Sequence, residues 1–475
     1  MSRQHPVPSP TRPDAGPAPP ARPATPPARF VGWLGSFGCA AVAYAVFQSL
    51  LGILPDGIAG NSARYAIAGV SGLGTGLAAW LSAALVRARA RERIPGAPPA
   101  ATSPALPSPG PFPELTAATY DTLIAELSVV EDPDCGRLTG WPHSLGEADG
   151  RRPGQPPQVR PTPVGTAYGL HIALELGVPD GRLATGELVR TLWHLRLPDG
   201  GWSARSQGSQ SRPEVTALVL GALARTGADP ERVAEEAARC ASAFTRELDR
   251  AGCESTHVLT IVLRGLLRAA PDARALPALR DALVQGAVTD PAREHRRCWA
   301  RRLSPPHGPP TAVHTAEAVV ALDRAARSPG AEPQHIRAAR EDGVRWLLAC
   351  PSTRHDTCRD LTRLREEIRR PRTDAPTHHE VLNVRQFTAA WVLRALLTPS
   401  ARDLARAEGL EEVWREQLAG AAAAVWRGQT DGIWTWAGID TAEPRRPLWM
   451  TYQGISALRA HALWRYQPDG PEPAR

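Results

Sequence analysis

Acidic, histidine and tyrosine side chains recur near the start of several apolar segments of the chain. These segments begin near Val164, Val215, His257, Val313, Val381 and Thr451. Carboxylates and imidazoles at such positions can exchange protons near neutral pH, and they can also bind a cation. The candidate catalytic residues are Glu214, His257, His314, Glu317, His379 and Glu380. The alternative is that these side chains cap their own helices or bond to nearby loop backbone.

The elements that would position these residues belong to a repeated unit. In residues 188–223 a helical pattern ends at a Pro-Asp-Gly-Gly turn, Trp202 follows the turn, and a second segment is apolar on nearly every face. A second copy spans residues 414–464 and contains Trp434, and a shorter third copy surrounds Trp141. Repetition of one supersecondary unit predicts a repeat architecture.

The rest of this region is also expected to be helical. Six helix pairs can be counted from residue 114 onward, and no alternating run of β-branched residues calls for a strand. Residues 361–370 combine arginine and glutamate at a spacing of four, which predicts a solvated surface helix. The predicted fold class is therefore all-α.

The motif Gln429-x-x-Gly432-x-Trp434 matches the Q-W repeat of terpenoid cyclases, and both full copies of the unit resemble the repeats of protein prenyltransferase β-subunits. The resemblance covers roughly residues 114–466. It implies an (α/α)6 toroid of six helix pairs, with six inner helices ringed by six outer ones and a pocket at one end of the inner ring. The residues that it marks as structural are Trp202, Gln429, Gly432 and Trp434.

The same resemblance implies where a ligand would bind. Polar groups early in the inner helices would face the pocket, and the candidate ligand-binding residues are Tyr168, Tyr452 and Gln453. Four further residues would line one mouth of a central cavity, namely Glu214, His257, His314 and His379. Six helix N-termini at that mouth would favour an anionic group such as a diphosphate.

The catalytic motifs of that superfamily are missing from the chain. No two aspartates are adjacent, which removes both the Asp-x-Asp-Asp acid of class II cyclases and the Asp-Asp-x-x-Asp magnesium motif. The zinc motif Asp-x-Cys of prenyltransferases occurs at Asp356-Thr357-Cys358, but the family's distant histidine falls where this chain has an alanine-rich helix. We predict no cofactor; if zinc is bound, the candidate ligands are Asp356, Cys358 and His379.

Composition excludes several classes of protein. The 475 residues include no lysine, so the chain has no P-loop lysine and no Schiff-base lysine. Seven cysteines without regular spacing argue against a disulfide framework and fit a reducing compartment. Residues 1–113 hold most of the net charge of +7, so the remainder is near neutral and does not resemble a nucleic-acid-binding domain.

The N-terminal region predicts a membrane anchor. Residues 30–54 and 65–86 contain no charged residue, and each run is long enough to span a bilayer. Arginines flank the outer ends of both runs, so the positive-inside rule places both termini and the toroid in the cytoplasm of a multi-pass cell-membrane protein. The predicted order is a disordered tail (1–28), a transmembrane hairpin (29–93), a Pro-rich linker (94–113), the toroid (114–466) and a second tail (467–475).

Two functions follow from these observations. The first is a membrane-anchored, non-catalytic module that binds a ligand or a protein partner in a bacterial regulatory or defence-type system. The second is an enzyme that acts on an isoprenoid or another apolar substrate by cyclisation or prenyl transfer. The missing motifs favour the first function, and fold resemblance alone does not decide between them.

Overall fold

The structure is a computed structural model of the chain, and it describes residues 112–133, 136–147, 159–177, 181–204, 210–249, 255–327, 332–350, 366–371, 377–436 and 444–465. The predicted tails, both predicted membrane spans and the linker up to residue 111 lie outside these residues. Within the described ranges, no helix is both long enough and apolar enough to cross a membrane.

The described residues form a mostly helical structure with thirteen α-helices, which confirms the predicted all-α class. Six of these helices lie inside the bundle, and we call them the inner helices: α4 (Pro163–Leu176), α6 (Pro213–Thr226), α8 (Thr256–Ala269), α10 (Ala312–Ala325), α13 (Thr388–Leu396) and α16 (Leu448–Arg465). The others are the outer helices: α3 (Phe112–Ala125), α5 (Thr185–His194), α7 (Pro230–Asp249), α9 (Leu276–Gln285), α11 (Gln334–Leu348), α14 (Pro399–Ala407) and α15 (Glu411–Arg427).

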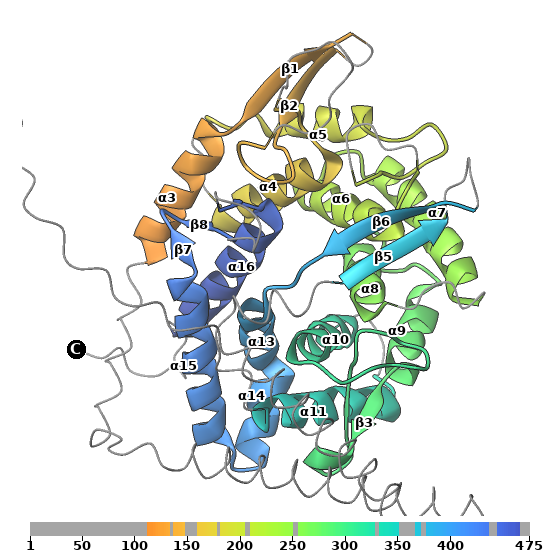
Figure 1. Ribbon diagram of the computed structural model, residues 1–475, viewed down its shortest axis with the longest axis vertical. Helices are drawn as coiled ribbons and strands as arrows, with labels where there is room; N and C mark the ends of the chain where they lie inside the picture. The colour runs from red at the N-terminus through yellow and green to blue at the C-terminus, as the bar shows by residue number, and fades with distance from the viewer. Residues whose placement is uncertain are drawn as a thin grey trace, which may run out of the picture. The chain divides into compact units, whose positions relative to one another are not determined.

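The inner helices contact one another in a closed cycle. Each packs against the next in chain order, and α16 returns to α4 (Figure 1). The outer helices cover the seams of this cycle: α5 touches α4 and α6, α7 touches α6 and α8, α9 touches α8 and α10, and α11 touches α10 and α13. Helix α15 covers the α13–α16 seam and α3 covers the α16–α4 seam. The ring is therefore closed by direct helix contacts.

Burial explains the division into two layers. Nearly every residue of α10 is buried, as expected for a helix with neighbours on all sides. Three inner helices also have side-chain N-caps. The hydroxyls of Thr162, Ser255 and Thr311 accept a hydrogen bond from a backbone N–H in the first turn of α4, α8 and α10, respectively. Helix α4 then ends at Gly177, which adopts the left-handed conformation (φ 65°) that favours glycine.

A recurring tryptophan connects each of four outer helices to the inner helix that follows it. The indole N–H donates to a carbonyl at the C-terminal end of the outer helix, at 2.5–2.9 Å. The backbone N–H of the same residue donates to a threonine hydroxyl in the inner helix, at 3.0–3.4 Å. We call this arrangement the Trp–Thr unit, and its four described copies are Trp141–Thr166, Trp202–Thr216, Trp299–Thr315 and Trp434–Thr451.

The turn around Trp434 shows how the Q-W motif is built. The side-chain carbonyl of Gln429 accepts a hydrogen bond from Gly432 N at 2.9 Å, and Gly432 has a φ of 75° that favours glycine. Trp434 is fully buried, and its ring lies so close to Gly454 of α16 that an added Cβ would approach it to 2.4 Å. The motif residues therefore close a tight turn and seat the indole against two helices.

Strands are present, contrary to the expectation of none. The described residues include four two-stranded antiparallel hairpins: β1–β2 (Ser128–Asp132, Gly136–Gly140), β3–β4 (Val288–Asp290, Arg296–Cys298), β5–β6 (Glu366–Pro371, His379–Val384) and β7–β8 (Gln429–Thr430, Ile433–Trp434). The last is the Q-W turn itself. These short pairs join or cover helices and leave the helical class unchanged.

Two sequence-based expectations were wrong in the region of β5–β6. Residues 366–370 were expected to belong to a helix, and an inner helix was expected to begin near Val381, but both segments are strands and the fifth inner helix begins at Thr388. Glu366 and Ile368 are buried, and the carboxylate of Glu366 bonds to Ser255, which caps α8, and to His314 of α10. Tertiary contacts thus override a local helical preference.

We expect Trp434→Ala to destabilise the ring by about 3–5 kcal/mol, because it leaves a cavity and removes the indole hydrogen bond to Val425. The melting temperature should fall by several degrees. Trp449→Ala is the matched control, since Trp449 lies on the same helix α16 but is only half-buried. Equal melting temperatures for wild type and Trp434→Ala would show that the unit does not stabilise the ring.

Candidate functional site

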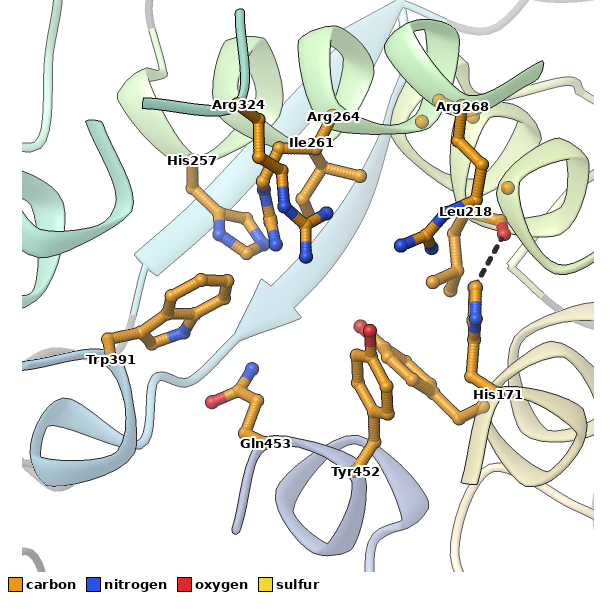
Figure 2. Close-up of a pocket in the computed structure, with 14 residues that line it drawn as sticks. His171, Leu218, His257, Ile261, Arg264, Arg268, Arg324, Trp391, Tyr452 and Gln453 are labelled. Carbon is orange, nitrogen blue, oxygen red and sulfur yellow. Dashed lines mark hydrogen bonds between the residues drawn. The ribbon is translucent and has the colours of Figure 1, made fainter. Parts of the chain in front are cut away.

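A cavity lies at the centre of the ring, and every inner helix contributes to its wall (Figure 2). Its volume of about 40 Å³ has room for about three water molecules. The lining residues are Tyr168, His171, Ala217, Leu218, Gly221, His257, Ile261, Arg264, Gly265, Arg268, Arg324, Trp391, Tyr452 and Gln453. The cavity therefore combines aromatic, cationic and small side chains.

Aromatic rings form two opposite parts of the wall. Tyr452 of α16 packs between Tyr168 and His171 of α4, with ring centroids 5.6 and 5.2 Å apart. Trp391 of α13 receives the guanidinium groups of Arg264 and Arg394 over its ring, at 4.3 and 4.5 Å from the centroid. Stacking of this kind fixes the rings and holds both arginines beside the cavity.

Arginines occupy the C-terminal halves of three neighbouring inner helices. Arg264 and Arg268 lie on α8, Arg324 on α10 and Arg394 on α13. Burial lowers the pKa of Arg264 to about 10 and that of Arg324 to about 9, and in both cases the nearby charge of Arg394 contributes. Crowding of positive charges in a poorly hydrated space is the physical cause.

Tyr452 lies beside these charges, and its hydroxyl points toward Arg268 and Arg324 (Figure 2). Burial by itself raises the pKa of this phenol, but Arg394, Arg324 and Arg268 outweigh that effect and lower the pKa to about 8. The same burial raises the pKa of Tyr168 well above its usual value. The two adjacent phenols therefore differ in acidity, because the arginine charges outweigh burial at Tyr452 but not at Tyr168.

A histidine–carboxylate pair stands at the opposite, N-terminal side of the cavity. His257 Nδ1 lies 3.0 Å from Glu317 Oε1, and the amide of Gln386 lies beside the same nitrogen. Burial lowers the pKa of His257, but Glu317 outweighs it and raises the pKa, while the pKa of Glu317 falls in turn. Within the described residues nothing hydrogen-bonds to His257 Nε2, and His257 lines the cavity.

The β5–β6 hairpin covers the N-terminal ends of three inner helices. Glu366 of β5 accepts a hydrogen bond from Ser255 at 2.7 Å and pairs with His314 at 3.3 Å. Arg370 of the same strand pairs with Glu214 at 3.4 Å. These contacts connect the hairpin to α6, α8 and α10, and they bury both Glu214 and His314.

The residues predicted from sequence separate into three groups. Tyr168, Tyr452, Gln453 and His257 line the cavity. Glu214, His314 and Glu317 are buried at the N-terminal side without lining it. His379 is exposed on β6, and Glu380 belongs to the same strand. The placement of these two residues in the first turn of an inner helix was therefore wrong.

The remaining sequence candidates concern metal binding. Asp356 and Cys358 lie outside the described residues, and His379 is exposed. Within the described ranges, no three histidine, cysteine, aspartate or glutamate side chains are grouped closely enough to hold a metal ion. A zinc site at Asp356, Cys358 and His379 stays a prediction.

Sequence reasoning missed the arginines as cavity residues. A signal was available, because five inner helices each carry an arginine late in an otherwise apolar stretch. These arginines are Arg225, Arg268, Arg324, Arg394 and Arg459. An arginine near a helix C-terminus is ordinarily explained by the helix dipole, so the pattern suggests no cavity until the ring is seen to close.

Neither a protein-family model nor a curated protein matches the chain. Inferences about function therefore rest on the ring, its cavity and the side chains that line it.

Tyr452 should lose its proton near pH 8, well below the pH at which an ordinary tyrosine ionises, because three arginines stabilise the phenolate. Ultraviolet difference spectroscopy across a pH titration would detect this early step. Tyr452→Phe should remove it, whereas Tyr168→Phe should leave it in place. An early step that survives in Tyr452→Phe would contradict the assignment.

Proposed function

We propose that the ring is an (α/α)6 toroid of the terpenoid cyclase and protein prenyltransferase type. The alternation of inner and outer helices around a closed cycle supports this proposal. So does the Q-W turn, whose glutamine, glycine and tryptophan act together in one tight turn.

We further propose that the protein is a membrane-anchored, non-catalytic module that binds a small ligand at the centre of the toroid, in a bacterial regulatory or defence-type system. The observation that carries this proposal is the central cavity to which all six inner helices contribute. A ligand held there would touch every repeat of the ring, so its binding would influence the packing of the whole domain.

The second candidate is an enzyme acting on an isoprenoid or another apolar substrate. The His257–Glu317 pair favours it, because a carboxylate on Nδ1 orients the imidazole while Nε2 faces the cavity, as in general acid–base catalysis. The aromatic wall of Tyr168, Tyr452 and Trp391 would suit a carbocation. A cavity of about 40 Å³ is small beside the ~300–1,000 Å³ usual for organic ligands, and this favours a compact ligand over an isoprenoid chain.

Binding at the ring centre can be tested by filling the cavity. Gly221 lines it, and an added Cβ there would meet its nearest neighbour only at 3.6 Å, so Gly221→Leu should place a larger side chain in the cavity with little backbone strain. Native mass spectrometry of protein purified from its own cells should find a small molecule on wild type that Gly221→Leu has lost. Equal retention by both proteins, or none by wild type, would contradict the proposal.

The enzyme alternative needs a separate measurement. Detergent-purified protein would be incubated with labelled geranylgeranyl diphosphate, with and without magnesium or zinc. We expect no turnover. Conversion to a cyclic or transferred product, lost in His257→Gln, would instead establish the enzyme.

The proposed membrane anchor has its own test. Residues 30–54 and 65–86 should hold the full-length protein in the membrane pellet, because each run can span the bilayer. A reporter protein fused after Arg93 should be located in the cytoplasm. A reporter that reads as exported, or a protein that stays in the supernatant, would rule out this topology.

A further inference from the structure

We propose that the β5–β6 hairpin is a proton-controlled lid over the N-terminal side of the cavity, and that it opens when a buried cluster of histidines and glutamates beneath it loses a proton. This inference rests on the proposed ligand-binding role of the cavity and names the regulation of that site. We call the buried group the His–Glu cluster, and it consists of His257, His314, Glu317 and Glu366.

The first observation is that the hairpin rests on the ring through side chains. Among the described elements, the backbones of β5 and β6 pack closely only against each other. The β1–β2 hairpin differs, because β2 packs along helix α5. A strand pair that is held by a few side-chain contacts can leave its place without unfolding a helix.

The attachment of the hairpin to α6 and α7 is made by arginine. Arg370 of β5 pairs with Glu214 at 3.4 Å and with Glu247 at 2.5 Å. Arg212, which precedes α6, donates a hydrogen bond to the Ile368 carbonyl at 3.4 Å. Arginine keeps its charge at every physiological pH, so this side stays attached and acts as the hinge of the lid.

The attachment to α8 and α10 is made by histidine. Glu366 accepts a hydrogen bond from Ser255 at 2.7 Å and pairs with His314 at 3.3 Å. Between the same two helices, His257 Nδ1 lies 3.0 Å from Glu317 Oε1. The charge of histidine ordinarily changes near neutral pH. This side can therefore be released by loss of a proton while the arginine side holds.

The two histidine–glutamate pairs influence each other. Burial by itself raises the pKa of Glu317 and of Glu366, but the two histidines outweigh burial at each glutamate and lower both pKa values. Burial likewise lowers the pKa of His257, but Glu317 and Glu366 outweigh it and raise the pKa. Two buried carboxylates thus depend on the same positive charge, and they repel each other when it is lost.

The other charged or titratable groups around the cluster keep their charge state from about pH 6 to about pH 9. Arg264 of α8 stays protonated, since burial lowers its pKa only to about 10. Tyr168 of α4 stays neutral, because burial raises the pKa of its phenol. Arg212 and Arg370 offset Glu214. The uncharged polar neighbours are Thr260 and Gln386.

The competing explanation is that the hairpin is a permanent cover. A permanent cover is best held by partners whose charge does not change, as on the α6–α7 side. Its protection from solvent would then be the same at every pH in this range. The histidine attachment on the other side makes closure depend on protons instead.

The direction of the pH response follows from proton linkage. The pKa of His257 is raised in the closed state, and water admitted on opening screens both carboxylates and returns this pKa toward its usual value of 6.5. The closed state therefore binds the proton more tightly. Closure should be strongest below pH 6.5, weaken as the pH rises through the raised pKa, and level off above it.

Hydrogen–deuterium exchange of the full-length, detergent-purified protein, followed by mass spectrometry, tests the lid. After correction for the intrinsic pH dependence of exchange, the protection of residues 366–371 and 379–384 should fall between about pH 6 and about pH 9. One proton allows a change of up to about tenfold per pH unit. The β1–β2 hairpin is the internal control, and its protection should stay constant.

Three variants assign the response to the cluster. Glu317→Gln keeps an acceptor for His257 Nδ1 but removes one of the two negative charges, so protection should stay high across the whole range. His257→Gln carries no titratable proton, so protection should be low and independent of pH. His171→Gln is the matched control, because His171 also lines the cavity but bonds to the Leu218 carbonyl, and it should respond as wild type does.

Several outcomes would overturn the lid: protection in wild type that does not change with pH, a pH response that persists in His257→Gln, or equal responses in wild type and Glu317→Gln. A loss of protection in β1–β2 as large as that in β5–β6 would indicate general unfolding and would overturn it as well. Ligand binding is tested separately. If Gly221→Leu loses a bound molecule but the hairpin shows no pH response, the ligand-binding role stands and only the lid fails.

Discussion

The ring depends on the Trp–Thr unit, in which one tryptophan bonds at the same time to the end of an outer helix and to the first turns of the next inner helix. The indole N–H satisfies a carbonyl that a helix C-terminus otherwise leaves open, and the buried ring fills the space between the two helices. Both hydrogen bonds come from one rigid side chain and its own backbone, so the unit fixes the angle between the helices. Four of the outer–inner helix pairs share this unit, so each pair turns the chain in the same way around the ring. The ring closes where α16 packs against α4.

That geometry sorts the polar residues by their position along the inner helices. First-turn residues such as Glu214, His257 and His314 gather at one end, where β5–β6 covers them and supplies Glu366 as a partner. Last-turn arginines gather at the other end, and within the described residues no carboxylate pairs with those that face the cavity. The two ends of one ring therefore have opposite character: the first is internally neutralised, and the second is cationic.

The sequence predicts the inner helices well because each has a local start signal and an apolar stretch, as the region from Thr162 to Gly177 illustrates. It predicts β5–β6 poorly, because contacts with helices distant in the sequence stabilise the strand that contains Glu366 and Ile368. A local sequence pattern carries no information about such contacts. Among cavity residues, Tyr168 and Tyr452 could be found from their helix positions. Arg324 could not, because a late arginine has an ordinary explanation until the closed ring shows which way it points.

We propose that the closed ring holds a small ligand in the cavity at its centre. A crystal structure of the protein purified from its own cells would test this proposal most directly. We expect electron density for a bound molecule in contact with Tyr168, Trp391 and Tyr452. A ring in which α16 does not meet α4, or a central cavity that holds only water, would contradict the proposal.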